Sequence, residues 1–366
     1  MIYEPAAHEP LTTQPWDEER VRAGIAAIVA DADASLDAGG WENHPRDDPD
    51  ELPERPTSLY LGSAGMVWAL HALGGSGLDL PALAEETLRR FRDRADYEVD
   101  PPGLQFGESG LLLVAHLLGV GDDARLRERI RENVRNETWE LMWGSPGTIL
   151  AARFAGMDDE ARESAAVLAG EWDTESGLWT QDLYGRVRRF LGPVHGFAGN
   201  VHALRGFLDH DELRSRTEAT LERYAVHEDG LVNWPPVDDA AQLDRVQWCH
   251  GAPGMVATLG DLMPHDLLLG GAELTWQAGP LAKGPGLCHG TAGNGYALLK
   301  AYEVTGDELW LDRARCFAVH ALEQVARERA ALGRGRYTLF TGDVGAALFA
   351  RSCLEGDARF PTMDVW

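Results

Sequence analysis

Segments that are apolar on every side alternate along the chain with segments that are apolar on one side only. Residues 66–70, 111–115 and 296–299 are too apolar all round to face water, and they predict buried inner helices. Residues 83–95 and 213–224 place apolar side chains at helical spacing, with Arg and Glu on the other faces, and predict outer helices. No strand-like alternation separates the two kinds of segment.

A Gly-x-x-Gly element opens each inner segment. Seven such elements occur, starting at Gly62, Gly107, Gly144, Gly196, Gly251, Gly290 and Gly342, with 37 to 55 residues between successive starts. Glycine allows helix ends that converge on a narrow ring to approach closely, and we also expect the tight turn into each helix to need positive φ.

Seven outer-inner helix pairs predict an all-α fold, a double α/α toroid in which each pair buries its inner face against its neighbours. One domain then occupies residues 1–366, where the length alone would suggest two or three domains. The repeats run over roughly residues 57–361, and an N-terminal outer helix is expected at about 16–37.

Composition and charge exclude several classes of protein. With 44% apolar and 25% charged residues the chain is globular, and its net charge of −26 repels nucleic acid and anionic membrane surfaces. No apolar run reaches the roughly 18 to 20 residues that span a bilayer, and the N-terminus does not resemble a secretory signal. Four scattered cysteines are too few for a disulfide framework and indicate a reduced, cytoplasmic protein.

Candidate chemistry gathers at one repeated position, the residue just before the first glycine, which should lie at the toroid mouth in every repeat. That position holds Leu61, Phe106, Trp143, His195, His250, His289 and Thr341. Cys249 and Cys288 each precede one of these histidines, so adjacent repeats bring two thiols and two or three imidazoles together. Thiolate and imidazole are ligands that Zn²⁺ prefers, and a helix N-terminus favours the thiolate.

The residues alone leave the ligand count open. Cys249, His250, Cys288 and His289 could close a four-ligand structural zinc site, or one histidine could turn away and leave a position for water or substrate. A third interpretation has both cysteines as small buried hydrophobic residues beside hydrogen-bonded histidines.

Three stretches resemble the signature motifs of the lanthionine synthetase C-like family. They read Trp-Cys-His-Gly-Ala-Pro-Gly at 248–254, Lys-Gly-Pro-Gly-Leu-Cys-His-Gly-Thr-Ala-Gly-Asn at 283–294, and His-Gly-Phe-Ala-Gly at 195–199. The resemblance runs through all seven repeats and includes the Ala-Arg-Phe-Pro ending at 358–361 that is typical of eukaryotic-type members. It implies the same α/α toroid.

The resemblance also implies roles for individual residues. Zinc would be held at the positions of Cys249, Cys288 and His289, with the fourth position open for a substrate thiol. Family members add cysteine thiols to dehydroalanine or dehydrobutyrine: the thiol belongs to the same peptide in bacterial cyclases, such as those that form lantibiotic thioether rings, and to glutathione in eukaryotic-type members. His195 stands at the position of the family's acid/base histidine. Glu140 stands at a position where bacterial cyclases tend to carry Asp and eukaryotic-type members carry Glu.

Two basic residues resemble different branches of the family. Arg245, four residues before Cys249, resembles the arginine of peptide cyclases, whereas Lys283, five residues before Cys288, resembles the glutathione-using branch. Lys283 and Lys300 are the only lysines in the chain, which makes a lysine beside this motif an unusual choice.

The chemistry of thiol addition agrees with these roles. Coordination to Zn²⁺ deprotonates a thiol, and several thiolates on one ion call for a nearby cation such as Lys283 or Arg245. Attack on the β-carbon forms an enolate that needs electrostatic stabilisation and then a proton, for which His195 is the expected donor. His250 is expected to face the substrate or support the ligands.

The leading hypothesis is therefore a zinc-dependent enzyme that adds a cysteine thiol, of glutathione or of a peptide, to a dehydroamino-acid peptide. The same hypothesis includes a dehydratase as a further partner. One alternative is a non-catalytic zinc module that binds glutathione or a peptide, in which His195 and Glu140 transfer no proton. The other is an α/α-toroid carbohydrate enzyme, suggested by 12 tryptophans, which needs a carboxylate pair such as Glu108 and Asp343.

Overall fold

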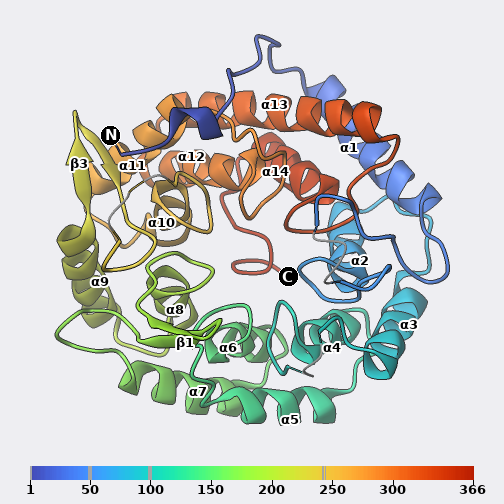
Figure 1. Cartoon of the computed structure of the whole chain (residues 1–366), viewed down its shortest axis with the longest axis horizontal. Coiled ribbons are helices and arrows are strands. Elements are labelled where there is room, and N and C mark those ends of the chain that lie inside the picture. Colours follow the sequence, from blue (N-terminus) through green and yellow to red (C-terminus); the bar gives the residue numbers. More distant parts are fainter. Residues whose placement is uncertain (1, 48–51, 98–100, 241–242, 244) are drawn as a thin grey trace.

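Two concentric rings of helices make up the described part of the chain, which comprises residues 2–47, 52–97, 101–240, 243 and 245–366 of a computed structural model (Figure 1). The outer helices are α1 (Glu18–Ala34), α3 (Leu80–Asp93), α5 (Asp123–Asn133), α7 (Asp158–Gly170), α9 (His210–Tyr224), α11 (His265–Ala278) and α13 (Glu308–Leu332). The inner helices are α2 (Ser63–Leu73), α4 (Glu108–Leu117), α6 (Ser145–Phe154), α8 (Phe197–Ala203), α10 (Ala252–Leu259), α12 (Thr291–Thr305) and α14 (Asp343–Glu355).

The predicted double α/α toroid of seven outer-inner pairs is confirmed. The N-terminal outer helix begins at Glu18, after the N-cap Asp17, inside the expected range. A single domain over residues 1–366 stays a prediction. None of the helices in the described ranges has the combined length and hydropathy needed to cross a membrane.

Inner and outer helices begin differently. Every inner helix has glycine at its N-cap and no side-chain cap. Five outer helices begin with an aspartate whose carboxylate accepts a backbone N–H of the first turn, namely Asp17, Asp79, Asp122, Asp209 and Asp307. Such caps stabilise a helix by about 1 kcal/mol, so local capping helps to fix these five outer helices, whereas the inner helices depend on burial.

Close packing, rather than backbone conformation, explains the paired glycines. Among the seven first glycines only Gly251 has positive φ, at 106°, so the expectation of positive φ at each turn is wrong. The second glycine of each element lies against a carbonyl of the preceding loop: a Cβ on Gly254 would lie 1.8 Å from Trp248 O, and one on Gly293 would lie 1.7 Å from Leu287 O. The loop can fold over the helix end only because these side chains are absent.

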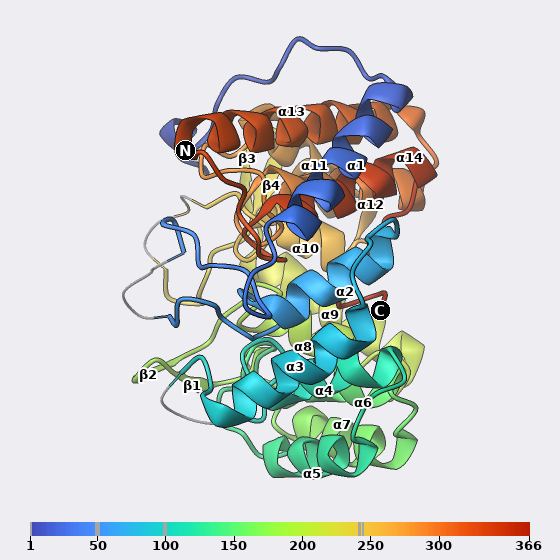
Figure 2. The same ribbon diagram turned by 90° about the vertical axis from the view of Figure 1, so that its right-hand side faces the viewer.

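Two short hairpins interrupt the helical pattern, which corrects the expectation that the chain has no strands. Strand β1 (Gln181–Leu183) pairs antiparallel with β2 (Arg186–Arg188), and β3 (Val226–Glu228) with β4 (Leu231–Asn233). The turn residues Tyr184, Gly185, Asp229 and Gly230 all have positive φ, as in two-residue type I′ turns. Figure 2 shows β1 and β2 projecting from the side of the ring at which the inner helices begin.

Backbone hydrogen bonds link the loops at this mouth from one repeat to the next. The N–H of Tyr60 donates to Gln105 O, and the N–H of Gln105 donates to Met142 O. Farther round, the same type of bond joins Leu141 N to Val194 O, Cys249 N to Cys288 O, Cys288 N to Phe340 O and Phe340 N to Tyr60 O. This belt holds corresponding residues of neighbouring repeats side by side.

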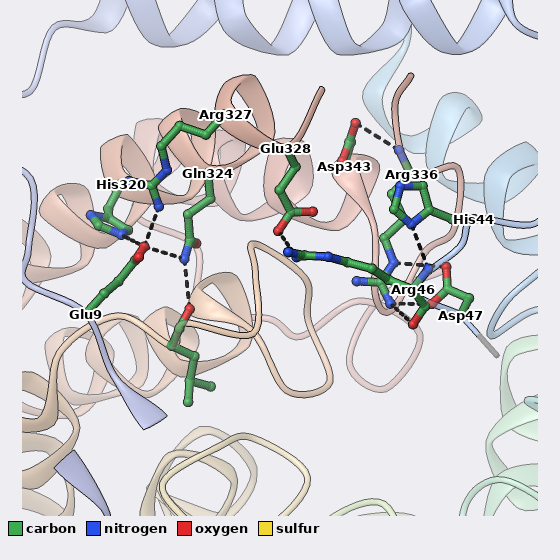
Figure 3. A network of polar contacts seen from close by, with 11 residues as sticks. Glu9, His44, Arg46, Asp47, His320, Gln324, Arg327, Glu328, Arg336 and Asp343 are labelled. Atoms are coloured by element: carbon green, nitrogen blue, oxygen red, sulfur yellow. Dashed lines mark hydrogen bonds and ion pairs between the residues drawn. The ribbon is translucent and has the colours of Figure 1, made fainter. Parts of the chain in front are cut away.

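The segments that precede α2 close the ring between its first and last repeats (Figure 3). The Glu9 carboxylate accepts a hydrogen bond from His320 Nε2 on α13 at 2.6 Å. Nearer the mouth, buried Arg336 pairs with Asp47, whose Oδ1 also accepts from Thr341 Oγ1 at 2.8 Å. Because Thr341 occupies the repeated mouth position, this pair fixes the N-terminal part of the chain directly beside the candidate site.

Candidate metal centre

Two cysteines and one histidine converge at the mouth. The ligand atoms of Cys249, Cys288 and His289 all lie within 4.8 Å of one another, and no second group of this kind is found among the described residues. Both cysteines are buried, and His289 is partly exposed. The belt produces this arrangement, because the Cys249 N–H donates to Cys288 O at 3.0 Å and so aligns the two residues.

This donor set fits a zinc ion. Zinc binds thiolate sulfur at about 2.3 Å and imidazole nitrogen at about 2.0 Å with tetrahedral geometry, which separates its ligand atoms by roughly 3.5 Å. Donor atoms already within 4.8 Å of one another reach that spacing through small side-chain rotations. Three protein ligands leave one tetrahedral corner for another molecule.

The two thiols affect each other's ionisation. A hydrogen bond with Cys288, helped by His289 and His250, lowers the pKa of Cys249 well below its usual range. Burial, together with the hydrogen bond to Cys249 and its negative charge, raises the pKa of Cys288. One thiolate therefore forms readily in the pair, and a bound cation would favour the second.

His250 lies next to the cluster but is not a member of it. Its ring lies 5.9 Å from the ring of His195, centroid to centroid. Burial lowers the pKa of His250 to about 4, aided by the positive charges of Arg245 and Lys283 and opposed by the negative charge of Cys249. His250 is therefore neutral at neutral pH, and exposed Arg245 lies close enough to affect it.

Lys283 reaches the cluster through a residue that the sequence analysis missed. Its Nζ donates to Gln247 Oε1 at 3.3 Å, and Gln247 Nε2 donates to Cys249 Sγ at 2.9 Å. Gln247 is buried and orients both groups. The positive charge of Lys283 also acts on Cys288, so this lysine lies beside both thiols.

A buried carboxylate orients His195. Glu140, which is fully buried, accepts the backbone N–H groups of Met142 at 3.0 Å and Trp143 at 2.5 Å. Its Oε2 lies 3.0 Å from His195 Nδ1. A neutral His195 that donates its Nδ1 proton to Glu140 presents Nε2 for proton transfer.

Tyr60 is a second residue that the sequence analysis missed. Burial, and then the charge of Cys288 and a hydrogen bond with it, raise the pKa of the Tyr60 phenol. Its ring stacks on Phe340 with 4.8 Å between centroids. Tyr60 stands two residues before the first glycine of its repeat, the position that Cys249 and Cys288 hold in theirs, so reading that register along the chain would have found it.

The carboxylates required by a carbohydrate enzyme point elsewhere. Buried Glu108 is bound by Arg92 of α3 and Arg125 of α5, two outer helices. Asp343 accepts the backbone N–H of Arg336, and burial raises its pKa to about 7. Glu108 and Asp343 thus form no catalytic pair, and that alternative loses its main support.

Fold and site together define a class of protein, a double α/α toroid whose mouth holds a Cys-Cys-His group able to bind a metal. Within that class the chain belongs to the lanthionine synthetase C-like family, because the family model for "Lanthionine synthetase C-like protein" matches residues 43–365. The resemblance drawn from the sequence motifs is confirmed.

Individual relatives agree with this assignment. Glutathione S-transferase LANCL1 of Danio rerio is 37% identical over 200 residues, covering 51% of this chain and 47% of the relative. LanC-like protein GCL1 of Arabidopsis thaliana is 31% identical over 192 residues, covering 48% of this chain and 44% of the relative. The chain thus spans about half the length of the curated relatives it matches. The solved structure of nisin cyclase superposes with a TM-score of 0.61 at 16% identity, covering 91% of this chain and 94% of that one, and shows the shared fold.

Proposed function

We propose that the protein is a zinc-dependent enzyme that adds a cysteine thiol to dehydroalanine or dehydrobutyrine in a peptide and forms a thioether. One observation carries this proposal: the Cys249, Cys288 and His289 group shares the mouth with His195, which a buried carboxylate orients and whose ring lies 5.9 Å from the ring of His250, the neighbour of Cys249 in the chain. The relative named as a glutathione S-transferase favours glutathione as the thiol.

Cys249, Cys288 and His289 would hold the metal, which when bound supplies a Lewis acid that keeps a substrate thiol deprotonated at neutral pH. In the addition step the thiolate sulfur bonds to the β-carbon, and the electron pair of the carbon–carbon double bond moves toward the carbonyl as an enolate. His195 Nε2 takes up the proton lost by the thiol and then returns it to the α-carbon, which balances the step. Glu140 positions His195 and stabilises its charged form.

Lys283 and Arg245 provide positive charge where the reaction develops negative charge. Both act electrostatically on His250, and Lys283 also acts on Cys288. Lys283, held by Gln247, would stabilise the enolate or bind a substrate carboxylate, and Arg245 would contact the substrate at the rim.

The reaction also suggests a cellular setting. All four cysteines are free, which suits a reducing, cytoplasmic environment. The dehydroamino acid must come from a prior dehydration, so we include a dehydratase among the proposed partners.

Mass spectrometry tests the proposal directly. The purified protein, with its metal content measured, is incubated with glutathione and a dehydroalanine peptide, with the His195→Asn variant in parallel. We expect the peptide to gain the mass of one thiol with the wild type at a rate well above the uncatalysed one, and far more slowly with the variant. A peptide that binds but gains no thiol would support the non-catalytic module instead.

A further inference from the structure

Tyr184 stands out at the tip of the β1–β2 hairpin. It has φ of +54°, an unfavourable conformation for a bulky residue, and 68% of its surface is exposed. Strain and exposure of an aromatic ring both oppose folding, so the fold alone gives no reason for a tyrosine in a turn that favours Asn, Asp or Gly.

Tyr184 nevertheless has definite contacts at the candidate site. Its hydroxyl accepts a hydrogen bond from Trp143 Nε1 at 3.2 Å, and its ring meets the His195 ring edge-on, with 5.9 Å between centroids. Burial of the hydroxyl raises the pKa of Tyr184, and the charge of Glu140 adds to this effect. The hydroxyl is therefore held by Trp143 at the mouth while much of the residue remains exposed beside the proposed proton donor.

Further aromatic rings continue from Tyr184 around the mouth. The rings of Trp143 and Phe106 lie 4.7 Å apart, and those of Phe106 and Tyr60 lie 5.0 Å apart. We call Tyr60, Phe106, Trp143 and Tyr184 the aromatic wall. It connects the neighbourhood of Cys288 at one end with His195 at the other, along the part of the mouth that carries no metal-binding side chain.

Phe106 and Tyr60 are buried, so the accessible ring surface of the aromatic wall is that of exposed Tyr184 and partly exposed Trp143. The indole N–H of Trp143 is already used by Tyr184. Of the nearby arginines, Arg188 on β2 pairs with Asp239, and Arg189, just after the strand, pairs with Asp238, whereas Arg186 is exposed on β2. A ligand here gains mainly apolar and aromatic contacts.

We propose that Tyr184, supported by Trp143 and Phe106, forms a subsite for an apolar side chain that flanks the dehydroamino acid in the peptide substrate. The inference rests on the proposed function and adds the substrate class: peptides with an apolar or aromatic residue next to dehydroalanine. Glutathione, with its two carboxylates, does not match such a surface and would bind on the side of Lys283.

The test compares two dehydroalanine peptides that differ only in the flanking residue, phenylalanine or glycine, with the same thiol. We expect kcat/KM to favour the phenylalanine peptide by about tenfold in the wild type. Tyr184→Ala should remove most of this preference, and Tyr184→Phe should keep it. Val226→Ala is the matched control: Val226 is also an exposed hairpin valine, but it lies on the β3–β4 hairpin, so the preference should be unchanged.

A second measurement separates failure of the subsite from failure of the proposed function. Calorimetry with the same peptides carrying alanine in place of dehydroalanine should show the same preference without any reaction. Equal affinity and equal kcat/KM for both peptides would overturn the subsite while leaving thiol addition intact. An equal loss for both peptides in Tyr184→Ala would overturn it too, since Tyr184 would then act only by positioning His195. If no thiol is added to either peptide, the proposed function fails, and the calorimetry alone decides on the subsite.

Discussion

Equivalent positions of the same ring carry opposite chemistry on the two sides of the mouth. On the histidine side, the residue before the first glycine is His195, His250 or His289; on the aromatic side it is Leu61, Phe106 or Trp143. Both sides share the glycine-capped inner helices and the backbone belt. The toroid therefore supplies seven equivalent positions, and the side chain at each decides whether it serves metal binding and proton transfer or apolar packing.

Loss of the metal should be the largest effect, and it should be confined to the histidine side. We expect Cys249→Ala to lose most of its zinc and its activity, because two remaining ligands bind zinc weakly, and to unfold at a lower temperature. Metal analysis and thermal melting check this. His250→Ala is the control and should keep its zinc; if it loses as much as Cys249→Ala, the site is a closed four-ligand one.

Removal of the proton donor should be the next largest effect. His195→Asn should slow thiol addition by about 10²- to 10⁴-fold, as is typical for general acid–base groups, while zinc content stays at the wild-type level. Kinetics and metal analysis on the same preparation measure both. A loss of activity below tenfold would indicate that another residue donates the proton, with Glu140 the first candidate.

On the aromatic side, truncation should cost stability rather than metal. Phe106 is 6% exposed, so Phe106→Ala should lower the free energy of unfolding by about 3 kcal/mol through the cavity it leaves. Denaturant titration with parallel zinc analysis tests this. Zinc loss from the folded variant would show that the two sides are coupled and would weaken the comparison.

Lys283 should give the smallest effect and the finest distinction. Lys283→Met should reduce kcat/KM with glutathione by about tenfold, which corresponds to ~1.4 kcal/mol for a partly desolvated charge pair. A plain thiol without carboxylates should be affected much less if Lys283 binds a carboxylate, and equally if it stabilises the enolate. Lys300→Met is the control, since Lys300 pairs with Glu303 on α12. If kcat/KM is unchanged with both thiols, Lys283 has no role in the reaction.

The sequence predicted the features that repeat and missed those that depend on ring closure. Seven apolar segments with paired glycines sufficed for the toroid, and the shared register brought Cys249 and Cys288 together. The cysteine register would have placed Tyr60 at the mouth, but not its contact with Cys288, which joins the first repeat to the sixth and exists only once the ring is closed. Gln247 stands one residue before a recognised motif, and its two hydrogen bonds depend on side-chain directions that spacing does not specify.

Local backbone detail was the least predictable part of the fold. Strands of three residues are too short to show alternation, although the Asp229-Gly230 dipeptide is a known signal for a two-residue hairpin turn. Tyr184 in the other hairpin carries no such signal, because its positive φ contradicts the preference of its residue type. The expectation of positive φ at the paired glycines failed for a related reason. A glycine can be required either by positive φ or by close packing of the backbone, and the sequence alone does not distinguish the two causes.

Closure of the ring affects how cooperatively the protein unfolds. An open stack of repeats has two free ends and can fray one repeat at a time. Here α1 packs against α13 and α14, and the Phe340 N–H donates to Tyr60 O, so every repeat has a neighbour on both sides. Opening any one repeat exposes two interfaces instead of one. We therefore expect unfolding to be a single concerted transition, in which native-state hydrogen exchange at the mouth requires opening of the whole ring.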